Sequence, residues 1–140
     1  MSAIDDTLED LATEFDLLGD WEERYRYVIE LGKELAPLSD AERSDANKVR
    51  GCASQVWLVT EPQPGGSVRF RGDSDAHIVR GLIALLLRLY SGRRPDDILA
   101  FDAKTAFETL GLAGALSAQR SNGLASMVAR IRRDAEYAAA

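Results

Sequence analysis

The pattern of hydrophobic positions changes twice along this chain. Between residues 4 and 18, apolar residues recur at three- and four-residue spacing with acidic residues between them, which predicts an amphipathic helix. Asp20 can cap a second helix, whose apolar face continues until Pro37 stops the pattern. Trp21 and Tyr25 lie on that face, so we interpret this aromatic stripe as part of the core rather than as a partner surface.

The middle of the chain has a strand-like pattern. Residues 38–48 are polar and irregular, which predicts a surface loop. Residues 55–60 are rich in β-branched and aromatic side chains, and residues 67–72 alternate between apolar and polar positions. Because the Pro- and Gly-containing run 62–66 separates the two, we expect a β-hairpin.

Helical spacing returns after the hairpin. Residues 76–90 are apolar on nearly every side, so we expect the central helix here, capped by the polar run 72–75. Pro95 fits the first turn of a short helix, and Asp102 can cap another.

A last helix is expected from Ser117 to Ala138. Its apolar positions Leu124, Met127, Val128 and Ile131 keep helical spacing. We interpret the charged side chains of Arg130, Arg132, Arg133 and Glu136 as a solvated face.

Composition narrows the class of protein. The chain has 140 residues, of which 46% are hydrophobic and 29% charged, as expected for one globular domain. A net charge of −6 disfavours binding to nucleic acid or to an anionic membrane surface, because both need a basic patch. The most apolar run, 81–87, is too short to span a membrane. The acidic N-terminus has no secretory signal, so we expect a cytoplasmic protein.

The only cysteine, Cys52, is the best candidate for chemistry. One thiol cannot form an intramolecular disulfide, and it cannot complete a zinc or iron–sulfur ligand set by itself, so we expect no metal. A reactive thiol and an inert, buried one both remain open. Gly51 and residues 53–54 have little bulk to bury the sulfur, while Lys48 and Arg50 supply positive charge. These neighbours predict a thiol pKa below the ordinary value.

The sequence does not offer the residues that other catalytic or nucleotide-binding sites would need. A Cys–His hydrolase would need the single histidine, His77, beside Cys52, and no carboxylate pattern marks His77 as a base. We therefore interpret His77 as a partly exposed helix residue rather than as a catalytic base. No glycine-rich phosphate loop is present, since Gly65 and Gly66 belong to the predicted turn.

The run from Gly51 to Trp57, Gly-Cys-Ala-Ser-Gln-Val-Trp, closely resembles the signature of the SufE family, the sulfur acceptors of cysteine desulfurases. The resemblance implies a single SufE-like domain over residues 1–140. The implied fold is α+β and IscU-like, a small antiparallel sheet (a hairpin, with or without a third strand) packed against several helices. Further blocks in family order are residues 21–25, 29–32, 72–76, 78–79, 81–83 and 120–124.

This resemblance also implies a function. A pyridoxal-phosphate cysteine desulfurase, of the SufS or CsdA type, forms a persulfide whose outer sulfur Cys52 accepts. The chain would stimulate the desulfurase and pass sulfur to an iron–sulfur scaffold of the SufBCD type. It would act with the desulfurase rather than as a stand-alone enzyme, and it would need no cofactor of its own. A cluster scaffold needs several thiolates, and this chain has one.

In the family, the cysteine lies on a guarded loop near an apolar cavity and turns outward when the desulfurase docks. The matching motifs place Arg120 near the loop or the partner surface and give Asp75 an influence on loop mobility or docking, although helix capping alone would also explain both. His77 departs from the small residue expected in its block. The residues implied to support the loop or the partner are Gly51, Ser54, Gln55, Asp75 and Arg120.

Two functional hypotheses remain open at this point. Either Cys52 carries sulfur, or the chain is a non-covalent regulatory binding module of a desulfurase and Cys52 is inert. The choice between a Suf and a Csd partner, the final sulfur recipient and the oligomeric state are open as well.

Overall fold

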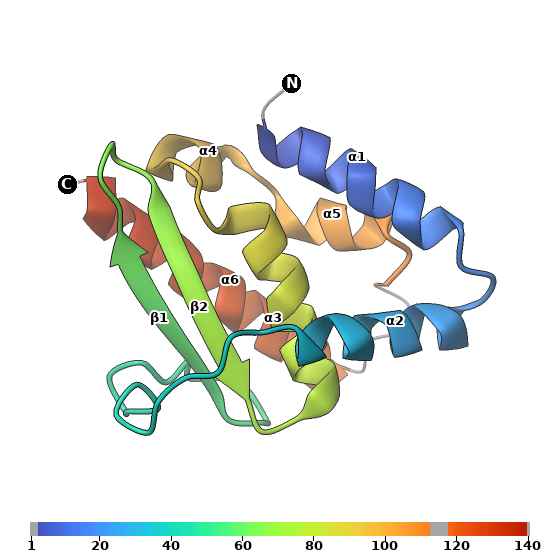
Figure 1. The fold of residues 1–140 in the computed structure, drawn as a ribbon, viewed down its shortest axis with the longest axis horizontal. Coiled ribbons are helices and arrows are strands. Elements are labelled where there is room, and N and C mark those ends of the chain that lie inside the picture. The colour runs from blue at the N-terminus through green and yellow to red at the C-terminus, as the bar shows by residue number, and fades with distance from the viewer. Residues whose placement is uncertain (1–2, 113–117, 140) are drawn as a thin grey trace.

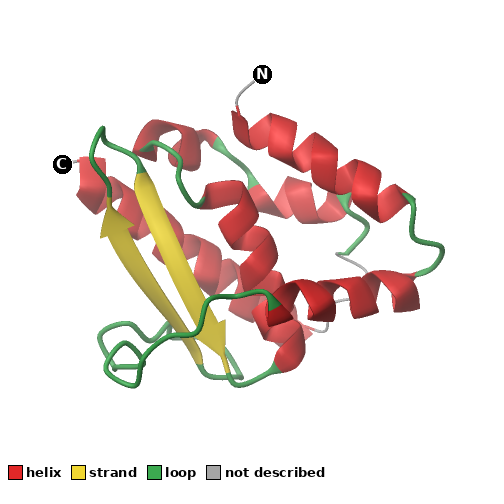
Figure 2. Ribbon diagram, in the orientation of Figure 1, coloured by secondary structure: helices red, strands yellow, loops and turns green. Residues whose placement is uncertain are grey.

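The computed structural model describes residues 3–112 and 118–139. Helices pack on one side of a two-stranded antiparallel sheet, so the predicted α+β class is confirmed (Figures 1 and 2). The expected start of the last helix, Ser117, lies outside the described residues. The elements are α1 (Ala3–Asp16), α2 (Trp21–Lys33), β1 (Val56–Pro62), β2 (Val68–Ser74), α3 (His77–Tyr90), α4 (Pro95–Ala100), α5 (Ala103–Thr109) and α6 (Ala118–Ala139).

Helix α3 is the centre of the core, as its apolar pattern predicts. Ten of its fourteen residues are buried, and it packs against α1, α2, α6 and β2 (Figure 1). The contact with α2 is close because glycines meet there. A Cβ on Gly32 would lie 2.6 Å from Gly81 N, and a Cβ on Gly81 would overlap Val28 O. Only glycine therefore allows these two helices to approach so closely.

The predicted hairpin is also confirmed. Val56 pairs with Ser74 and Pro62 with Val68, so β2 extends two residues beyond the expected end. Gly65 and Gly66 have φ angles of 88° and 93°, which only glycine adopts easily in a turn. Within the described residues a third strand is reduced to isolated bridges, one of which joins Lys48 to Trp57.

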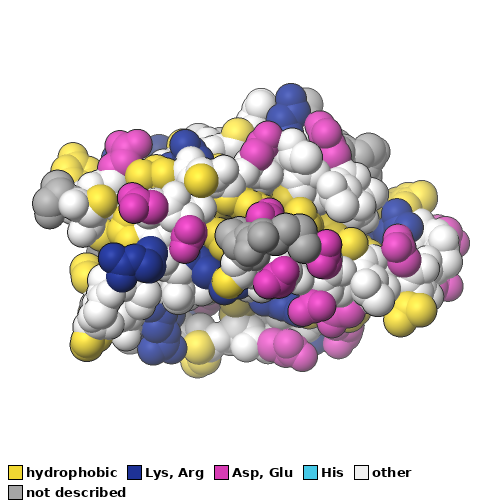
Figure 3. Space-filling view, turned by 90° about the horizontal axis from the view of Figure 1, so that it is seen from above, with side chains coloured by type: hydrophobic (Ala, Val, Ile, Leu, Met, Phe, Trp, Pro, Cys, Tyr) yellow, Lys and Arg dark blue, Asp and Glu magenta, His cyan; other side chains and the backbone are white. Residues whose placement is uncertain are grey.

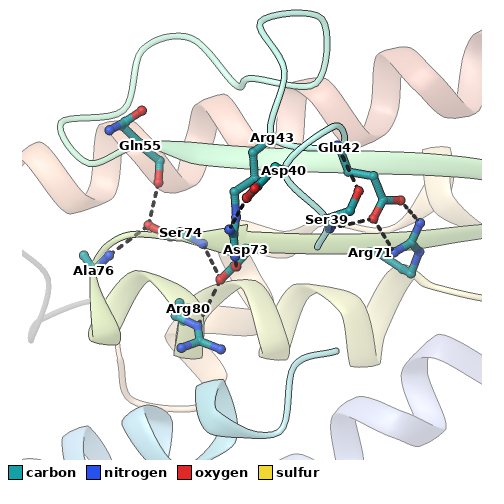
Figure 4. A network of polar contacts seen from close by, with 10 residues as sticks. All are labelled: Ser39, Asp40, Glu42, Arg43, Gln55, Arg71, Asp73, Ser74, Ala76 and Arg80. Carbon is teal, nitrogen blue, oxygen red and sulfur yellow. Dashed lines mark hydrogen bonds and ion pairs between the residues drawn. The ribbon is translucent and has the colours of Figure 1, made fainter. Parts of the chain in front are cut away.

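The polar loop between α2 and β1 crosses over β2 on the side away from α3 (Figure 1). It is fixed there by charged contacts (Figure 4). Asp73 on β2 is 5% exposed and forms ion pairs with Arg43 of the loop at 2.9 Å and with Arg80 of α3 at 3.1 Å. Glu42 of the loop pairs with Arg71 of β2, which holds the pKa of this glutamate down to about 2. The loop thus reaches β1 along a fixed path.

Most of the predicted helix starts are correct. Asp20 accepts a hydrogen bond from Glu23 N, Asp102 accepts from the first turn of α5, and Pro95 opens α4. The prediction that residues 72–75 cap α3 was wrong, because β2 runs to Ser74 and the N-cap is Ala76, which has no side-chain cap bond.

Two predictions about side-chain burial were also wrong. Trp21 is 56% exposed rather than part of the core, because it lies in the first turn of α2, where it stacks edge-on against Tyr25. Arg130 and Arg132 do not belong to a solvated face. Arg132 donates to Leu99 O at 3.0 Å, and Arg130 donates to carbonyl oxygens of the loop before β1.

The outer surface agrees with the net charge. Acidic side chains are spread over the face seen from above, with hydrophobic side chains exposed between them (Figure 3). In the ranges 3–112 and 118–139, no helix is both long enough and apolar enough to cross a membrane.

We predict that Gly81→Ala destabilises the fold. Alanine is the better helix former by about 1 kcal/mol, but the new methyl group would overlap the backbone of Val28, which cannot move aside as a side chain could. The expected net loss is about 1–3 kcal/mol in the free energy of unfolding, measured by urea denaturation. Gly19→Ala is the control, because its Cβ would be 3.4 Å from the flexible carboxylate of Glu23. Equal stability of the two variants would contradict the prediction.

Candidate functional site

Cys52 lies at the tip of a loop whose two ends meet on β1. We call residues 46–58 the Cys52 loop, and divide it into a first leg (46–49), a tip (50–54) and a second leg (55–58). The first leg pairs with the second through two hydrogen bonds of 2.8 Å, from Val49 N to Val56 O and from Leu58 N to Asn47 O. The tip is therefore a short excursion from a closed, β-like base.

Residues after β2 hold the second leg. Asp75 Oδ1 accepts a hydrogen bond from Gln55 N at 3.0 Å, and Ser74 Oγ donates to Gln55 O at 2.7 Å (Figure 4 shows the Ser74 contact). Asp75 therefore binds the Cys52 loop instead of capping α3, which gives a geometric basis for the predicted influence on loop mobility. Gln55 takes part through its backbone.

Helix α6 lies under the tip. Cys52 Sγ is 3.5 Å from Gly123 O, to which it donates a weak hydrogen bond. Gly51 has a φ of 89°, and a Cβ there would be 2.5 Å from Ser126 Oγ. Glycine is thus required at Gly51 both for the turn and for the close approach to α6.

The thiol borders a cavity of about 280 Å³. Arg120 is the only charged residue among the described lining residues, and its guanidinium carbon also lies 5.8 Å from the ring centroid of Tyr25. The structure thus brings the predicted residues Ser54 and Arg120 to the sulfur. The lining comprises Cys52, Ala53, Ser54, Ala76, Ile78, Val79, Arg120, Gly123 and Met127.

The electrostatic prediction for Cys52 was wrong. The side chain is half-buried, and burial raises the pKa of the thiol because a thiolate loses hydration there. Burial is the cause of this shift, and positive charge from Lys48 and Arg50 does not reverse it. Arg50 is exposed, so its charge is screened by solvent. In this conformation Cys52 is a protected thiol rather than an activated thiolate.

The residues around Cys52 support neither a Cys–His catalytic pair nor a metal site. His77 is exposed at the start of α3 and does not line the cavity, so the geometry gives no support to a Cys–His pair. Among the residues with described positions, no group of three His, Cys, Asp or Glu side chains could hold a metal ion. What the arrangement can do is present one sulfur nucleophile from a loop.

A larger hollow of about 1060 Å³ lies between α4, α5 and α6. It is lined mainly by apolar side chains such as Leu99, Phe107 and Val128, and Cys52 does not border it. Helix α6 contributes residues to both hollows, and therefore lies between this larger one and Cys52.

Apart from Arg120, sequence reasoning missed the parts of the site that α6 supplies. Gly123, Ser126 and Arg130 each contact the Cys52 loop. They follow one another at three- and four-residue spacing, so they lie on one face of the helix. The signal was present as a small, polar and charged stripe beside the apolar positions, but nothing local indicated that the Cys52 loop covers it.

The raised pKa leads to a prediction about reactivity. The rate of Cys52 alkylation by iodoacetamide, measured against pH, should have its midpoint above the ordinary thiol value of ~8.5. Because the native state keeps its proton longer than the unfolded state, this group should also remove stability as pH rises above the unfolded-state pKa. The urea-unfolded chain is the control and should titrate near ~8.5. A native midpoint below that of the unfolded chain would refute the prediction.

We also predict that Asp75→Ala loosens the second leg. Without the carboxylate, Gln55 N loses its acceptor, and the Gln55 amide should exchange with deuterium faster. Asp75→Asn keeps an oxygen at the same place and should retain much of the protection. Asp45→Ala, which removes an exposed acidic residue from the approaching loop, is the control for charge. Unchanged exchange in Asp75→Ala would show that this contact does not hold the leg.

Comparison with known proteins agrees with the sequence signature. The family model described as "SufE: Fe-S metabolism associated domain" matches residues 9–135. An uncharacterised SufE-like protein of Rhizobium etli is 54% identical over 137 residues, covering 96% of this chain and 93% of that protein. Another from Rhizobium meliloti is 49% identical over 133 residues, covering 93% and 95%. The solution structure of a hypothetical protein from Thermus thermophilus has a TM-score of 0.77 at 20% identity, covering 94% and 95%, and so shares the fold. The chain therefore belongs to the SufE family, whose domain is associated with iron–sulfur metabolism.

Proposed function

We propose that this protein carries sulfur for iron–sulfur metabolism, with Cys52 as the acceptor. In this proposal a pyridoxal-phosphate cysteine desulfurase supplies a persulfide, and a cluster-assembly scaffold receives the sulfur. The observation that carries the proposal is the placement of the single thiol, at the tip of a loop with a fixed base, beside a cavity and next to Arg120. Family membership supports the same assignment.

The transfer is a thiol exchange without net oxidation. The Cys52 thiolate attacks the outer sulfur of the donor persulfide, and a new S–S bond forms as the donor S–S bond breaks. The donor leaves as a thiolate and takes up the proton that Cys52 released. Cys52 then holds a persulfide, whose outer sulfur is the group to be passed on. In this proposal the cationic side chain of Arg120, which lines the same cavity, stabilises the deprotonated persulfide on Cys52.

The position of Cys52 suits a resting state. A half-buried thiol with a raised pKa is largely protonated near neutral pH, so it reacts slowly with stray oxidants and reductants. Moving the tip into solvent would remove the desolvation and lower the pKa, which would favour the thiolate. In the proposed cycle, docking of the desulfurase moves the tip outward and thereby activates the nucleophile.

One observation favours a second candidate function. The same raised pKa is expected for an inert cysteine in a non-covalent regulatory module that only binds and stimulates the desulfurase. The two candidates differ in whether sulfur becomes attached to Cys52, which can be measured directly.

The test is intact-protein mass spectrometry after incubation with L-cysteine and a cysteine desulfurase of the Suf or Csd type. We expect a gain of one sulfur atom, located on Cys52 by peptide mapping and removed by a reductant. Cys52→Ser should gain no sulfur and lose stimulation, because its hydroxyl is nearly isosteric but far less nucleophilic. No gain by the wild-type chain, or full stimulation by Cys52→Ser, would support the regulatory module instead.

A further inference from the structure

Arg130 of α6 contacts the backbone of the Cys52 loop, although the sequence pattern indicated only a solvated side chain there. Its Nη1 donates to Lys48 O at 3.2 Å, and its Nη2 donates to Ala46 O at 3.0 Å. The Arg130 side chain is 15% exposed, and its bond to Lys48 O is partly buried, while its bond to Ala46 O is exposed. Hydrogen bonds from a charged donor are stronger than those between neutral groups. The first leg is therefore bound to α6 as well as to β1.

A second carboxylate fixes the guanidinium itself. Arg130 Nε lies 3.1 Å from Asp134 Oδ2, four residues along α6, and the side chain of Asp134 is 13% exposed. The same Asp134 oxygen accepts a hydrogen bond from Thr60 Oγ1 of β1 at 2.7 Å. The planar guanidinium is thus held in one orientation, with its Nε towards Asp134 and its two outer nitrogens towards the loop.

The tip has much weaker contacts. Within the described part of the chain, the hydrogen bond assigned to residues 50–54 is that from Cys52 Sγ to Gly123 O, at 3.5 Å. The second leg is fixed by Asp75 and Ser74. Both legs are therefore anchored by several polar contacts, while the tip rests on a single weak bond and on packing.

We propose that Arg130 is a positioning residue for Cys52, because it holds the first leg against α6 and so determines where the tip seats the sulfur. Residues 50–54 then move as a hinged segment while the two legs remain in place. Arg130 does not reach the reacting sulfur, and it acts only through the backbone at Ala46 and Lys48. The inference rests on the proposed function in taking Cys52 as the reacting group.

The experiment uses no desulfurase, so its outcome is independent of whether sulfur transfer occurs. Alkylation of Cys52 by iodoacetamide is followed from pH 6 to pH 10 in the wild-type chain, in Arg130→Gln and in Arg130→Lys. With Arg130→Gln we expect the rate near neutral pH to rise about three- to tenfold, the change that corresponds to losing roughly one net hydrogen bond. The midpoint should also fall towards that of a free thiol, because the sulfur leaves its buried seat more often. Arg130→Lys should restore part of both values, since an ammonium group can still reach a carbonyl.

Arg133→Gln is the matched control. It removes the same charge from the same helix, and Arg133 is also close to Asp134, at 3.6 Å, but its side chain is 58% exposed. We expect wild-type alkylation kinetics from this variant. Equal effects of the two Gln substitutions, or a folded Arg130→Gln with the wild-type rate and midpoint, would overturn the proposal.

A further variant covers the case in which Arg130→Gln does not fold. Thr60→Val is nearly isosteric and removes the hydroxyl that binds Asp134, so it loosens the guanidinium without touching the loop. We expect both changes in the same direction as in Arg130→Gln but smaller, a smaller rise in the alkylation rate and a smaller fall in its midpoint. Thermal unfolding, measured on the same variants, distinguishes a positioning role from a purely structural one. A purely structural role would lower the melting temperature but leave the alkylation midpoint of the folded chain unchanged.

Discussion

The anchoring of the Cys52 loop at both legs is the constraint on which the rest of the site depends. The legs are held by the backbone bonds to β1, by Asp75 and by Arg130, whereas the tip has one weak bond to Gly123. Each ordinary hydrogen bond contributes about 1 kcal/mol, so releasing a leg costs several times more than lifting the tip. In the proposed cycle, motion would thereby be confined to residues 50–54, which carry the sulfur.

The scaffold around the loop explains why its legs can be so fixed. Asp73 is buried between Arg43 and Arg80, so it joins the approaching loop and α3 to the sheet. The close packing of α2 on α3 through Gly32 and Gly81 makes that side rigid as well. The Cys52 loop is thus carried by a well-packed core rather than by another loop.

Burial and reactivity oppose each other at Cys52, and movement of the loop tip is the proposed way in which the protein reconciles them. Shielding lowers the thiolate fraction, which protects the sulfur but slows nucleophilic attack. A tip that moves between a seated and an exposed position allows both properties in turn. Arg120, which lines the cavity and lies against Tyr25, is the cationic group that the proposal assigns to the seated position.

The sequence by itself determined the elements with strong local signals. Helical spacing predicted α1, α2 and α3, Asp20 and Asp102 predicted the caps of α2 and α5, and the Gly51–Trp57 run identified the family. These features depend on neighbours a few residues away, so a linear pattern records them.

Only the tertiary structure decided the environment of the sulfur. The partners of the Cys52 loop on α6, Gly123 and Arg130, are 71 to 84 residues away from it in the chain, and Asp75 is 20 residues from Gln55. Nearby Lys48 and Arg50 suggested a lowered pKa, but desolvation by the packed helix is the larger effect and raises it. Burial depends on which distant segments meet, and local sequence does not specify that.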